Sequence, residues 1–547
     1  MRPVTPVPDA RRGALRVGVL DLLIDEVPSR RWLDRAYRAV FKKQYASIMP
    51  QAVAVWCRQL GHHVRYAVYY GQCPPHRLLP DDLDVLFVSA YTQASALAYA
   101  LARLYGRRGT RTVIGGPHAR SFPADCLRFF DLAVDACDKD LVRDILRGGL
   151  DPGTIATTTR TLADLPSVEE RMPEIAASAF TRGRPVPTSN VPLLASLGCP
   201  YACDFCIDWR SPYVVLSPER LAADLTYLAR HWPGVMVSFH DPNFAVRFDQ
   251  VLAVMEGSVG KACNPYIMES SLSILRGERL RRLRDTNCIY VAPGIESWHD
   301  YANKAGAGRV TGAAKLACLV EHFGELHAHG MGLQANFMFG TDADHGDEPV
   351  ELTKEFIRRL PFVWPTVNVP TPFGNTPLYD RYLAQERILR TMPFTFYYTP
   401  FLVTTLRHYD PADYYRRLED LYAVMTSNEM LWRRLRTRES AGMRFLHAVR
   451  TFGMRQDLAS FRKLGALLRT DPGFRAFHEG RSAELPELYQ QEYQRKLGCY
   501  ASLLARADRT PLLEHSGRAA STAPGPHRHA ASRPPTHLAR LHAAAGT

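Results

Sequence analysis

Three cysteines crowd into one short segment, LLASLGCPYACDFCIDW, which spans residues 193–209. They are Cys199, Cys203 and Cys206, whereas the remaining cysteines of the eleven in the chain are scattered. A structural zinc site needs four ligands, usually supplied as two separated pairs, and the sequence has no second pair. Three thiolates suit a 4Fe–4S cubane, which four cysteines normally hold. Three protein ligands would leave one iron open, so the spacing predicts a cluster able to accept another ligand.

The segment CPYACDFC resembles the Cys-x3-Cys-x-aromatic-Cys signature of radical S-adenosylmethionine (radical SAM) enzymes, with Phe205 as the aromatic residue. The resemblance extends over residues of about 190–375. It implies that S-adenosylmethionine (SAM) chelates the open iron and that an electron from the cluster cleaves SAM to a 5′-deoxyadenosyl radical. This radical would abstract hydrogen from an unactivated position of a small-molecule or natural-product substrate. The resemblance also implies an electron donor such as flavodoxin or ferredoxin.

Other segments of this region resemble places where the family contacts SAM. The segment GIES at 294–297 resembles a SAM contact in which Glu296 reaches ribose or methionine groups. The segment FMFGTD at 337–342 resembles a glycine turn near adenine. The segment FHDPNF at 239–244 departs from the Gly-Gly-Glu that the family often has there, and Asp241 would take its place. The resemblance thus assigns cofactor contacts to Phe205, Asp241, Gly294, Glu296, Ser297 and Gly340.

The elements that must position these residues are short apolar runs alternating with helical stretches. In the N-terminal part, strands are expected at 16–24, 64–70, 83–91, 112–118 and 131–136, with helices at 47–63 and 94–109. This alternation predicts an α/β domain with a doubly wound, flavodoxin- or Rossmann-like parallel sheet. In the following part, strands are expected at 192–197, 235–241, 265–271, 289–297, 332–340 and 366–372. Six such units match the partial (β/α)6 barrel that the radical SAM resemblance implies, and its active site would lie at the C-terminal rim.

A doubly wound domain before such a barrel resembles the class of radical SAM enzymes with a cobalamin-binding domain. A parallel sheet binds ligands at the C-terminal ends of its strands. Those ends carry two hydroxyl residues, Ser89 and Thr92, and two glycines, Gly115 and Gly116, that would leave room for a nucleotide tail. The Asp-x-His-x-x-Gly motif that supplies a cobalt ligand in other cobalamin proteins does not follow the first strand. The alternative is a domain that only caps the barrel.

The remaining chain divides by composition. Asp410-Pro411 and Asp471-Pro472 are typical helix starts, and Tyr414, Leu418, Leu421 and Met425 form an apolar stripe at helical spacing. The predicted organisation is a disordered leader (1–14), the cobalamin-binding-like domain (15–150), a linker (151–190), the barrel (191–400), a helical C-terminal domain (401–508) and a disordered tail (509–547).

The bulk composition argues against two classes of protein, those that bind nucleic acid and those that span a membrane. The net charge is +13, but the basic residues are nearly all Arg interspersed with acids, so nucleic-acid binding is not favoured. Apolar runs are too short for a membrane span, and the N-terminus has no signal core, which predicts a cytoplasmic protein.

The leading functional hypothesis is cobalamin-dependent methylation of an unactivated carbon by a radical SAM enzyme. The sequence assigns no catalytic side chain, because the cofactors would carry out the difficult chemistry. One alternative keeps the radical but not the methyl transfer, and leads to rearrangement, cyclisation or oxidation. A second is an iron–sulfur sensor without turnover, and a third is a zinc module.

Overall fold

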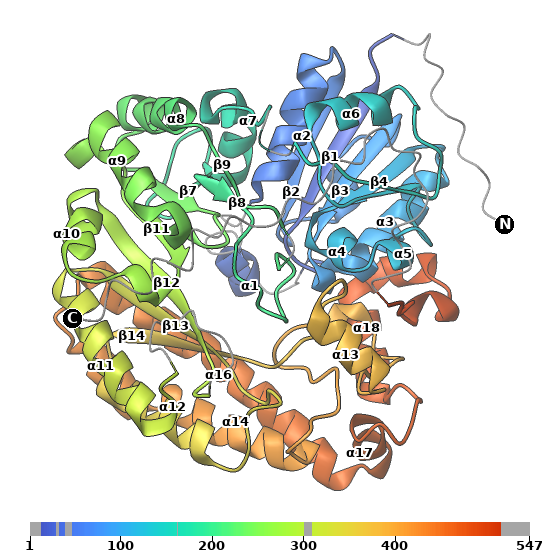
Figure 1. Ribbon diagram of the computed structural model, residues 1–547. Coiled ribbons are helices and arrows are strands. Elements are labelled where there is room, and N and C mark those ends of the chain that lie inside the picture. Colours follow the sequence, from blue (N-terminus) through green and yellow to red (C-terminus); the bar gives the residue numbers. More distant parts are fainter. Residues whose placement is uncertain are drawn as a thin grey trace, which may run out of the picture.

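The computed structural model describes residues 13–28, 32–38, 46–160, 162, 164–209, 211–299 and 309–515. Most of the predicted leader (1–12) and most of the predicted tail (516–547) therefore lie outside the described residues. Within them, two parallel sheets stand side by side, and helices of the C-terminal third run along the second sheet and reach back to the first (Figure 1).

The first sheet is wholly parallel, with the strand order β2-β1-β3-β4-β5-β6. Its strands are β1 (Arg16–Leu22), β2 (His63–Tyr69), β3 (Val85–Ala90), β4 (Arg111–Gly115), β5 (Leu132–Val134) and β6 (Thr154–Ala156). The helices of this domain are α1 (Trp32–Tyr37), α2 (Ile48–Gln59), α3 (Ser95–Gly106), α4 (Gly116–Ser121), α5 (Pro123–Cys126) and α6 (Lys139–Leu146). The order reverses between β1 and β3, and such a switch point opens a crevice at the C-terminal strand ends. The doubly wound prediction is confirmed.

The central strands β1 and β3 are buried along most of their length because helices cover both faces, whereas the edge strand β2 begins with exposed and half-buried residues. All of Val85, Leu86, Phe87 and Val88 are buried, which is the pattern of a parallel sheet. Ser47 stands at the N-cap of α2 as its type suggests, but its side chain does not cap the helix. Instead its backbone N–H and its hydroxyl donate to the buried carboxylate of Asp21, at 2.8 and 3.3 Å.

The second sheet is also parallel, and its strands follow one another in space as they do in sequence, in the order β7-β10-β11-β12-β13-β14. They are β7 (Asn190–Leu193), β10 (Met236–Phe239), β11 (Tyr266–Ser270), β12 (Cys288–Glu296), β13 (Gly332–Met338) and β14 (Val363–Asn368). The helices between them are α8 (Pro218–His231), α9 (Phe248–Ser258), α10 (Glu278–Asp285), α11 (Gly312–Ala328) and α12 (Glu348–Arg359). Sequential order with helical crossovers is the partial barrel that was predicted.

The segment predicted as a linker carries structure of its own. Besides β6 it forms α7 (Val168–Ala179), whose N-terminus is a capping box made by Ser167 and Glu170. Arg171 of this helix is fully buried, and its guanidinium donates to the side chain of Gln51 on α2 and to the carbonyl of Pro192 on β7. One buried cation therefore ties the two sheets together.

The C-terminal region is helical, as predicted. It contains α13 (Pro377–Ala384), α14 (Pro411–Met425), α15 (Asn428–Leu435), α16 (Ala441–Thr470), α17 (Pro472–His478) and α18 (Glu487–Leu497). Asp410 and Asp471 cap α14 and α17 through their carboxylates, and the apolar stripe on α14 is buried. The hydroxyls of Tyr414 and Tyr422 donate to the carbonyls of Phe339 and Val367, so α14 is fastened to the ends of β13 and β14.

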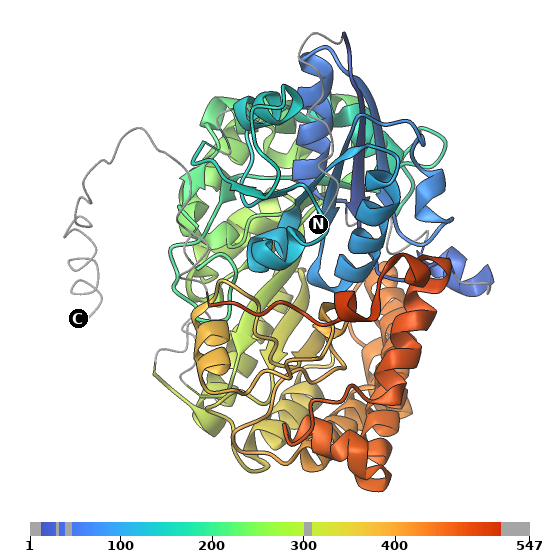
Figure 2. The ribbon, with the colours of Figure 1, turned by 90° about the vertical axis from the view of Figure 1, so that its right-hand side faces the viewer.

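After α18 the chain returns along the N-terminal domain (Figure 2). The side chain of Arg128 on this domain donates to the carbonyls of Ala507 and Thr510, and the backbone N–H of Leu512 donates to Asp125. Residues 509–515 were predicted as the start of the tail, but they lie against the first domain, so packed chain extends past the predicted boundary.

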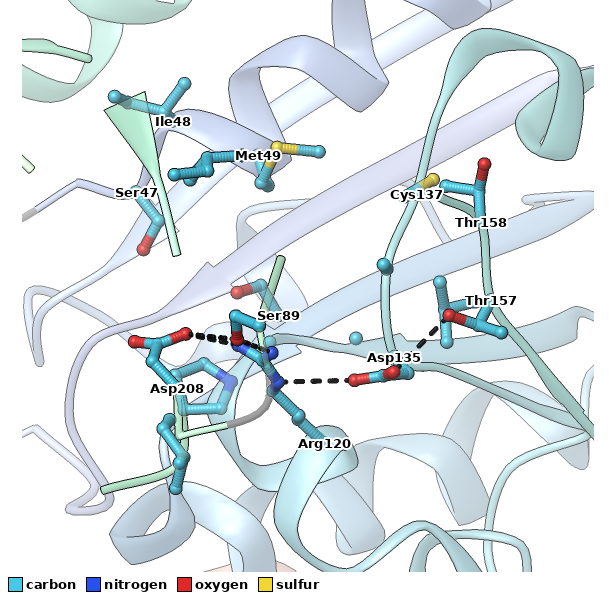
Figure 3. A pocket seen from close by; sticks show the side chains of 18 of the residues that line it. Ser47, Ile48, Met49, Ser89, Arg120, Asp135, Cys137, Thr157, Thr158 and Asp208 are labelled. Carbon is cyan, nitrogen blue, oxygen red and sulfur yellow. Dashed lines mark hydrogen bonds and ion pairs between the residues drawn. The ribbon is translucent and has the colours of Figure 1, made fainter. Parts of the chain in front are cut away.

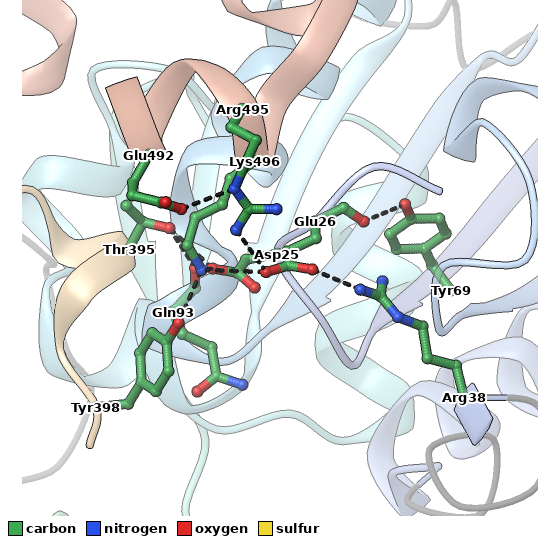
Figure 4. Close-up of polar contacts among 10 residues, drawn as sticks. All are labelled: Asp25, Glu26, Arg38, Tyr69, Gln93, Thr395, Tyr398, Glu492, Arg495 and Lys496. Atoms are coloured by element: carbon green, nitrogen blue, oxygen red, sulfur yellow. Dashed lines mark hydrogen bonds and ion pairs between the residues drawn. The ribbon is translucent and has the colours of Figure 1, made fainter. Parts of the chain in front are cut away.

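A buried polar network marks the junction of α18 with the first domain (Figure 4). Lys496, with 3 % of its side chain exposed, is paired with Asp25 in the loop after β1 and donates to the hydroxyl of Tyr398. Thr395 also donates to Asp25, at 3.1 Å. The ion pair of Lys496 with Asp25 thus joins α18 to the loop after β1, and hydroxyl groups of the segment at 393–401 hydrogen-bond to both members of the pair.

Candidate functional site

The cysteine loop leaves the second sheet directly after β7 and is closed at its base. The two-residue strands β8 (Ser196–Leu197) and β9 (Val214–Val215) pair antiparallel and hold the two ends of the loop together. Gly198 has a φ of +74°, and a Cβ there would overlap the carbonyl of Pro212 on the returning chain. Glycine is therefore required immediately before Cys199, at the point where the loop crosses itself.

Within this loop the three cysteines differ in exposure. Cys199 is buried, whereas Cys203 and Cys206 are half-buried. The backbone N–H of Asp208 donates to Sγ of Cys206 at 3.4 Å, which is a contact to one of the expected cluster ligands. The predicted aromatic, Phe205, is half-buried and packs against the core.

The loop has no preassembled site for a single ion. Among the described residues, no group of three His, Cys, Asp or Glu side chains converges closely enough to hold one metal ion. None of the cysteines that the structure describes forms a disulfide. Cys199, Cys203 and Cys206 stand on one loop whose two ends are held together by β8 and β9.

Asp241 supports the base of the cysteine loop from the neighbouring strand. It follows β10 and is 2 % exposed, and its carboxylate accepts from the N–H of Ala195 at 3.0 Å and from the hydroxyl of Ser196 at 2.6 Å. Burial raises the pKa of Asp241 to about 6, against the opposing effect of these hydrogen bonds. The contact of Asp241 with SAM stays a prediction, whereas its hydrogen bonds to Ala195 and Ser196, just before Cys199, are observed.

The segment 375–381, which follows β14, forms hydrogen bonds with the cysteine loop on another side. The indole N–H of Trp209 donates to the carbonyl of Asn375 at 2.7 Å. The backbone N–H of Leu378 and the guanidinium of Arg381 both reach Asp204, at 2.9 and 2.8 Å. The loop is thus fixed along its length as well as at its base.

A cavity of about 670 Å³ lies between the cysteine loop and the C-terminal strand ends of the first sheet (Figure 3). The first sheet and its following loops contribute residues to one wall, among them Ser47, Met49 and Ser89. The cysteine loop contributes residues to the opposite wall, among them Asp208 and Trp209. The cavity therefore occupies the switch point of the doubly wound sheet and the rim of the barrel at once.

The cavity is lined mostly by apolar and hydroxyl-bearing side chains. Among the described lining residues the charged side chains are Arg120, Asp135 and Asp208, which are paired with one another. Burial lowers the pKa of His240, another lining residue, to about 4, so that its imidazole is neutral near pH 7. The walls thus offer a large ligand apolar contact and hydroxyl groups, and their charged side chains form one ion-paired group in which Arg120 is shared by two carboxylates.

Three of the four residues predicted for cobalamin line this cavity, namely Ser89, Gly115 and Gly116. Gly116 has a φ of +85°, and a Cβ there would lie 2.9 Å from the hydroxyl oxygen of Ser89, so the chain that follows β4 passes close to the end of β3. Thr92 is buried in a short 3-10 helix and is not among the lining residues.

The residues predicted to contact SAM at the end of β12 share a strained turn. Glu296 has a φ of +65°, unusual for a residue with a side chain, and the pairing of β12 with β13 shifts its register at this point. A Cβ on Gly294 would overlap the carboxylate of Glu296, so the glycine leaves the space that this carboxylate fills. Ser297 is buried, and its hydroxyl donates to Asp344 at 3.3 Å.

Gly340 lies at the turn after β13, where the family resemblance places adenine. Its φ is +100°, and a Cβ there would lie 2.7 Å from the ring of Tyr414 on α14. Its backbone N–H donates to the buried carboxylate of Asp344 at 3.0 Å. The close approach that requires glycine in the described structure is therefore that of Tyr414, and the contact with adenine stays a prediction.

Two sets of residues at this site were not found from the sequence. The first is the buried carboxylate of Asp21 with Ser47 beneath the cavity; burial raises the pKa of Asp21 to about 6. The second is Arg120 on α4, which contacts Asp208 in the cysteine loop. The position of Asp208, two residues after Cys206, was a usable signal, but nothing near Arg120 in sequence indicated its partner.

No helix among the described residues combines the length and the apolar character that crossing a bilayer requires.

Comparison with known proteins finds chains of similar sequence and solved structures of similar fold. No family model matches the chain. A bacteriochlorophyllide d C-8(2)-methyltransferase from Chlorobaculum tepidum is 23 % identical over 377 residues, which cover 65 % of this chain and 80 % of that protein. The C-12(1)-methyltransferase of the same organism is 23 % identical over 319 residues, which cover 55 % of this chain and 67 % of that protein.

Two solved structures share the fold. The cobalamin-dependent S-adenosylmethionine radical enzyme OxsB, with aqua-cobalamin bound, superposes with a TM-score of 0.53 at 12 % identity and covers 89 % of this chain and 80 % of its own. The radical S-adenosylmethionine methyltransferase TsrM from Kitasatospora setae, with cobalamin and a [4Fe-4S] cluster bound, superposes with a TM-score of 0.50 at 13 % identity over 82 % of this chain and 99 % of its own. The predicted resemblance to radical SAM enzymes with a cobalamin-binding domain is confirmed, and so is the predicted fold.

Proposed function

We propose, on the basis of this family likeness, that the chain is a cobalamin-dependent radical SAM methyltransferase. One observation carries the proposal: a single cavity of about 670 Å³ is bordered by the cysteine loop of the barrel and by the switch point of the first sheet. A reaction that uses two cofactors needs them to face the same space, since proximity supplies much of the rate.

The residues present fit each expected group. Cys199, Cys203 and Cys206 would hold the 4Fe–4S cluster, because they are three thiols on one loop that a two-strand ladder closes. The hydroxyl and apolar walls of the cavity, with Gly115 and Gly116 at the strand ends, would hold cobalamin. When bound, the cluster and SAM supply a carbon-centred radical, and methylcobalamin supplies the methyl group.

The chain's own residues would position these groups and keep water away from them. Asp241 holds the strand before Cys199, and Trp209 with Asn375 fixes the far side of the loop. The packed segment at 393–401 and α14 lie over the barrel ends of β13 and β14 and limit access of solvent. The contacts proposed for SAM are Phe205, Asp241, Gly294, Glu296, Ser297 and Gly340.

The substrate is proposed to be a small molecule with an unactivated carbon. The similar proteins from Chlorobaculum tepidum are named as C-8(2)- and C-12(1)-methyltransferases of bacteriochlorophyllide d. An external one-electron donor such as flavodoxin or ferredoxin would reduce the cluster, because the reductive cleavage of SAM consumes one electron.

The first test compares cysteine variants after anaerobic reconstitution with iron and sulfide. The variant Cys199→Ala/Cys203→Ala/Cys206→Ala should lose iron, acid-labile sulfide and all formation of 5′-deoxyadenosine from SAM. The matched control replaces three half-buried or exposed cysteines outside the loop, Cys73, Cys318 and Cys499, and should keep all three properties. Wild-type protein with a cluster that forms no 5′-deoxyadenosine would support a sensor, and zinc without sulfide would support a zinc module.

The second test asks whether the cavity holds the corrin. Gly115→Leu adds a side chain to the cavity wall at a position where a Cβ meets only the carbonyl of Val134 at 3.8 Å. The control, Gly106→Leu at the end of α3, adds the same side chain where a Cβ has no neighbour within 4 Å. Hydroxocobalamin should stay bound to wild type and to the control through gel filtration, as read from its visible spectrum, and should be lost from Gly115→Leu. Radical formation without corrin binding to wild type would favour rearrangement, cyclisation or oxidation over methylation.

A further inference from the structure

We propose that Arg120 is a positioning residue through which the N-terminal domain sets the reduction potential of the cluster held by Cys199, Cys203 and Cys206. The inference deepens the proposed function and rests on the part of it that places a cluster on these cysteines. It does not depend on cobalamin being bound.

The guanidinium of Arg120 joins the two domains at the cavity wall (Figure 3). Its Nη1 donates to Oδ1 of Asp208 in the cysteine loop at 2.7 Å, and its Nη2 donates to the hydroxyl of Ser211. Its Nε lies 3.3 Å from Oδ1 of Asp135, which follows β5 in its own domain. The hydroxyl of Ser211 donates to the same oxygen of Asp208 at 3.0 Å. One cation therefore holds one carboxylate of the first domain and one of the cysteine loop.

The main chain around Arg120 fixes where this cation stands. The side chain of Asn375 donates to the carbonyl of Arg120, and the carbonyl of Asn375 in turn accepts from Trp209 of the cysteine loop. A Cβ on Gly374 would overlap the carbonyl of Ser121, the residue after Arg120. Helix α4, the segment after β14 and the cysteine loop thus meet at one point, where Gly374 lies against the backbone of α4.

The ion pair acts directly beside an expected cluster ligand. Asp208 donates its backbone N–H to Sγ of Cys206 at 3.4 Å, and its side chain carries the negative charge that Arg120 balances. Hydrogen bonds to the sulfurs and net charge near the cluster set the reduction potential of iron–sulfur centres. Arg120 would influence the potential in both ways, by neutralising Asp208 and by orienting the peptide that reaches the sulfur.

The pair contributes little to overall stability, so that its removal should leave a folded protein. The side chains of Arg120 and Asp208 are 31 % and 22 % exposed, so water can solvate either charge in part when its partner is removed. A change in potential can therefore be measured in a protein that still holds its cluster.

Electrostatics predicts opposite signs for the two partners. In Arg120→Gln the charge of Asp208 is left unbalanced, which favours the oxidised, less negative cluster and lowers its potential below that of wild type. In Asp208→Asn a negative charge beside the cluster is removed while Arg120 keeps Asp135 as its partner, which raises the potential above that of wild type. The double variant has no net change in charge and should return close to wild type.

The experiment is a potentiometric titration of the reconstituted, corrin-free protein, followed by the electron paramagnetic resonance signal of the reduced cluster. The matched control is Arg143→Gln, which removes an ion pair with Asp140 of similar exposure on α6 of the same domain and should leave the potential unchanged. A structural role alone would shift both single variants in one direction or shift neither. Either of these results, with iron and sulfide retained, overturns the proposal.

Two further results keep the test decisive. If Arg120→Gln loses its cluster, the sign of the shift in potential of Asp208→Asn decides whether the inference holds. The variant Arg120→Lys keeps the positive charge, so it should hold the cluster with a potential near that of wild type. A potential of Asp208→Asn at or below that of wild type would then refute the inference. Wild type that holds no cluster at all would refute the proposed function instead, so the two failures are distinguishable.

Discussion

Replacing Asp241 by Asn should change the stability of the protein by an amount that depends on pH. Burial raises the pKa of this carboxyl from 3.8 to about 6. A shift of roughly two pKa units corresponds to about 3 kcal/mol. The folded state therefore binds a proton on Asp241 between about pH 4 and pH 6, where the unfolded state has released it. Stability from this group is highest below pH 4 and is lost as the pH rises through 6.

Asparagine removes this dependence and adds a constant cost. The two oxygens of Asp241 accept from Ala195 and from Ser196, but the amide of asparagine has one oxygen and would turn N–H groups toward one donor. One unsatisfied contact costs about 1–3 kcal/mol at any pH. The free energy of unfolding of the variant should be lower than that of wild type near pH 4, and the two values should be about equal near pH 7.

The assay is the melting temperature of both proteins by scanning fluorimetry in steps from about pH 4 to pH 7. In a domain of about 150–250 residues, 1 kcal/mol shifts the melting temperature by about 2–4 °C, so the difference, variant minus wild type, should rise by roughly 6–12 °C. Burial lowers the pKa of the adjacent His240 to about 4, which gives the opposite pH dependence, but this residue is present in both proteins and cancels in the difference. A difference that stays constant over the range would refute the reasoning.

Two other substitutions test how the site is assembled. Gly374→Ala places a Cβ into the backbone of α4 and within 2.8 Å of the Phe122 ring, and should lower the melting temperature by the equivalent of about 1–3 kcal/mol. The control, Gly324→Ala on α11, adds a Cβ that has no neighbour within 4 Å and should not lower the melting temperature. Equal melting temperatures for the two variants would contradict the close contact at Gly374. Lys496→Met leaves Asp25 buried without its cation and should cost about 3–5 kcal/mol, with faster proteolysis at 393–401 than in wild type. Adding Asp25→Asn should recover part of this loss, and a double variant no more stable than the single one would count against a buried pair.

The sequence predicted much of the fold because the relevant signals are local. Alternating apolar runs and helical stretches predicted both sheets, and the strands lie within a few residues of the expected ranges. The caps at Asp410 and Asp471 followed from residues that bond to the next few N–H groups. The segment at 151–190 was predicted as a linker from its Thr and Pro content, and the structure shows that it contains β6 and α7.

The sequence also indicated one part of the candidate site and missed another. The spacing of Cys199, Cys203 and Cys206 lies within eight residues, so it could be read without knowing the fold. Ser47 was correctly placed at a helix start, but its side chain bonds to Asp21 because β1 happens to end beside it. A cap is decided within one turn, whereas this contact needs the parallel sheet to form first.

By itself, therefore, the sequence determined the spacing of the three cysteines, the two α/β units and their order. Only the tertiary structure decided that these units share a cavity, that Tyr414 occupies the space beside Gly340 and that Arg120 reaches Asp208 across 88 positions of chain. The physical reason is that spacing and periodicity record interactions within a few turns of chain. Contacts between distant segments depend on how the sheets pack, and no local pattern carries that information.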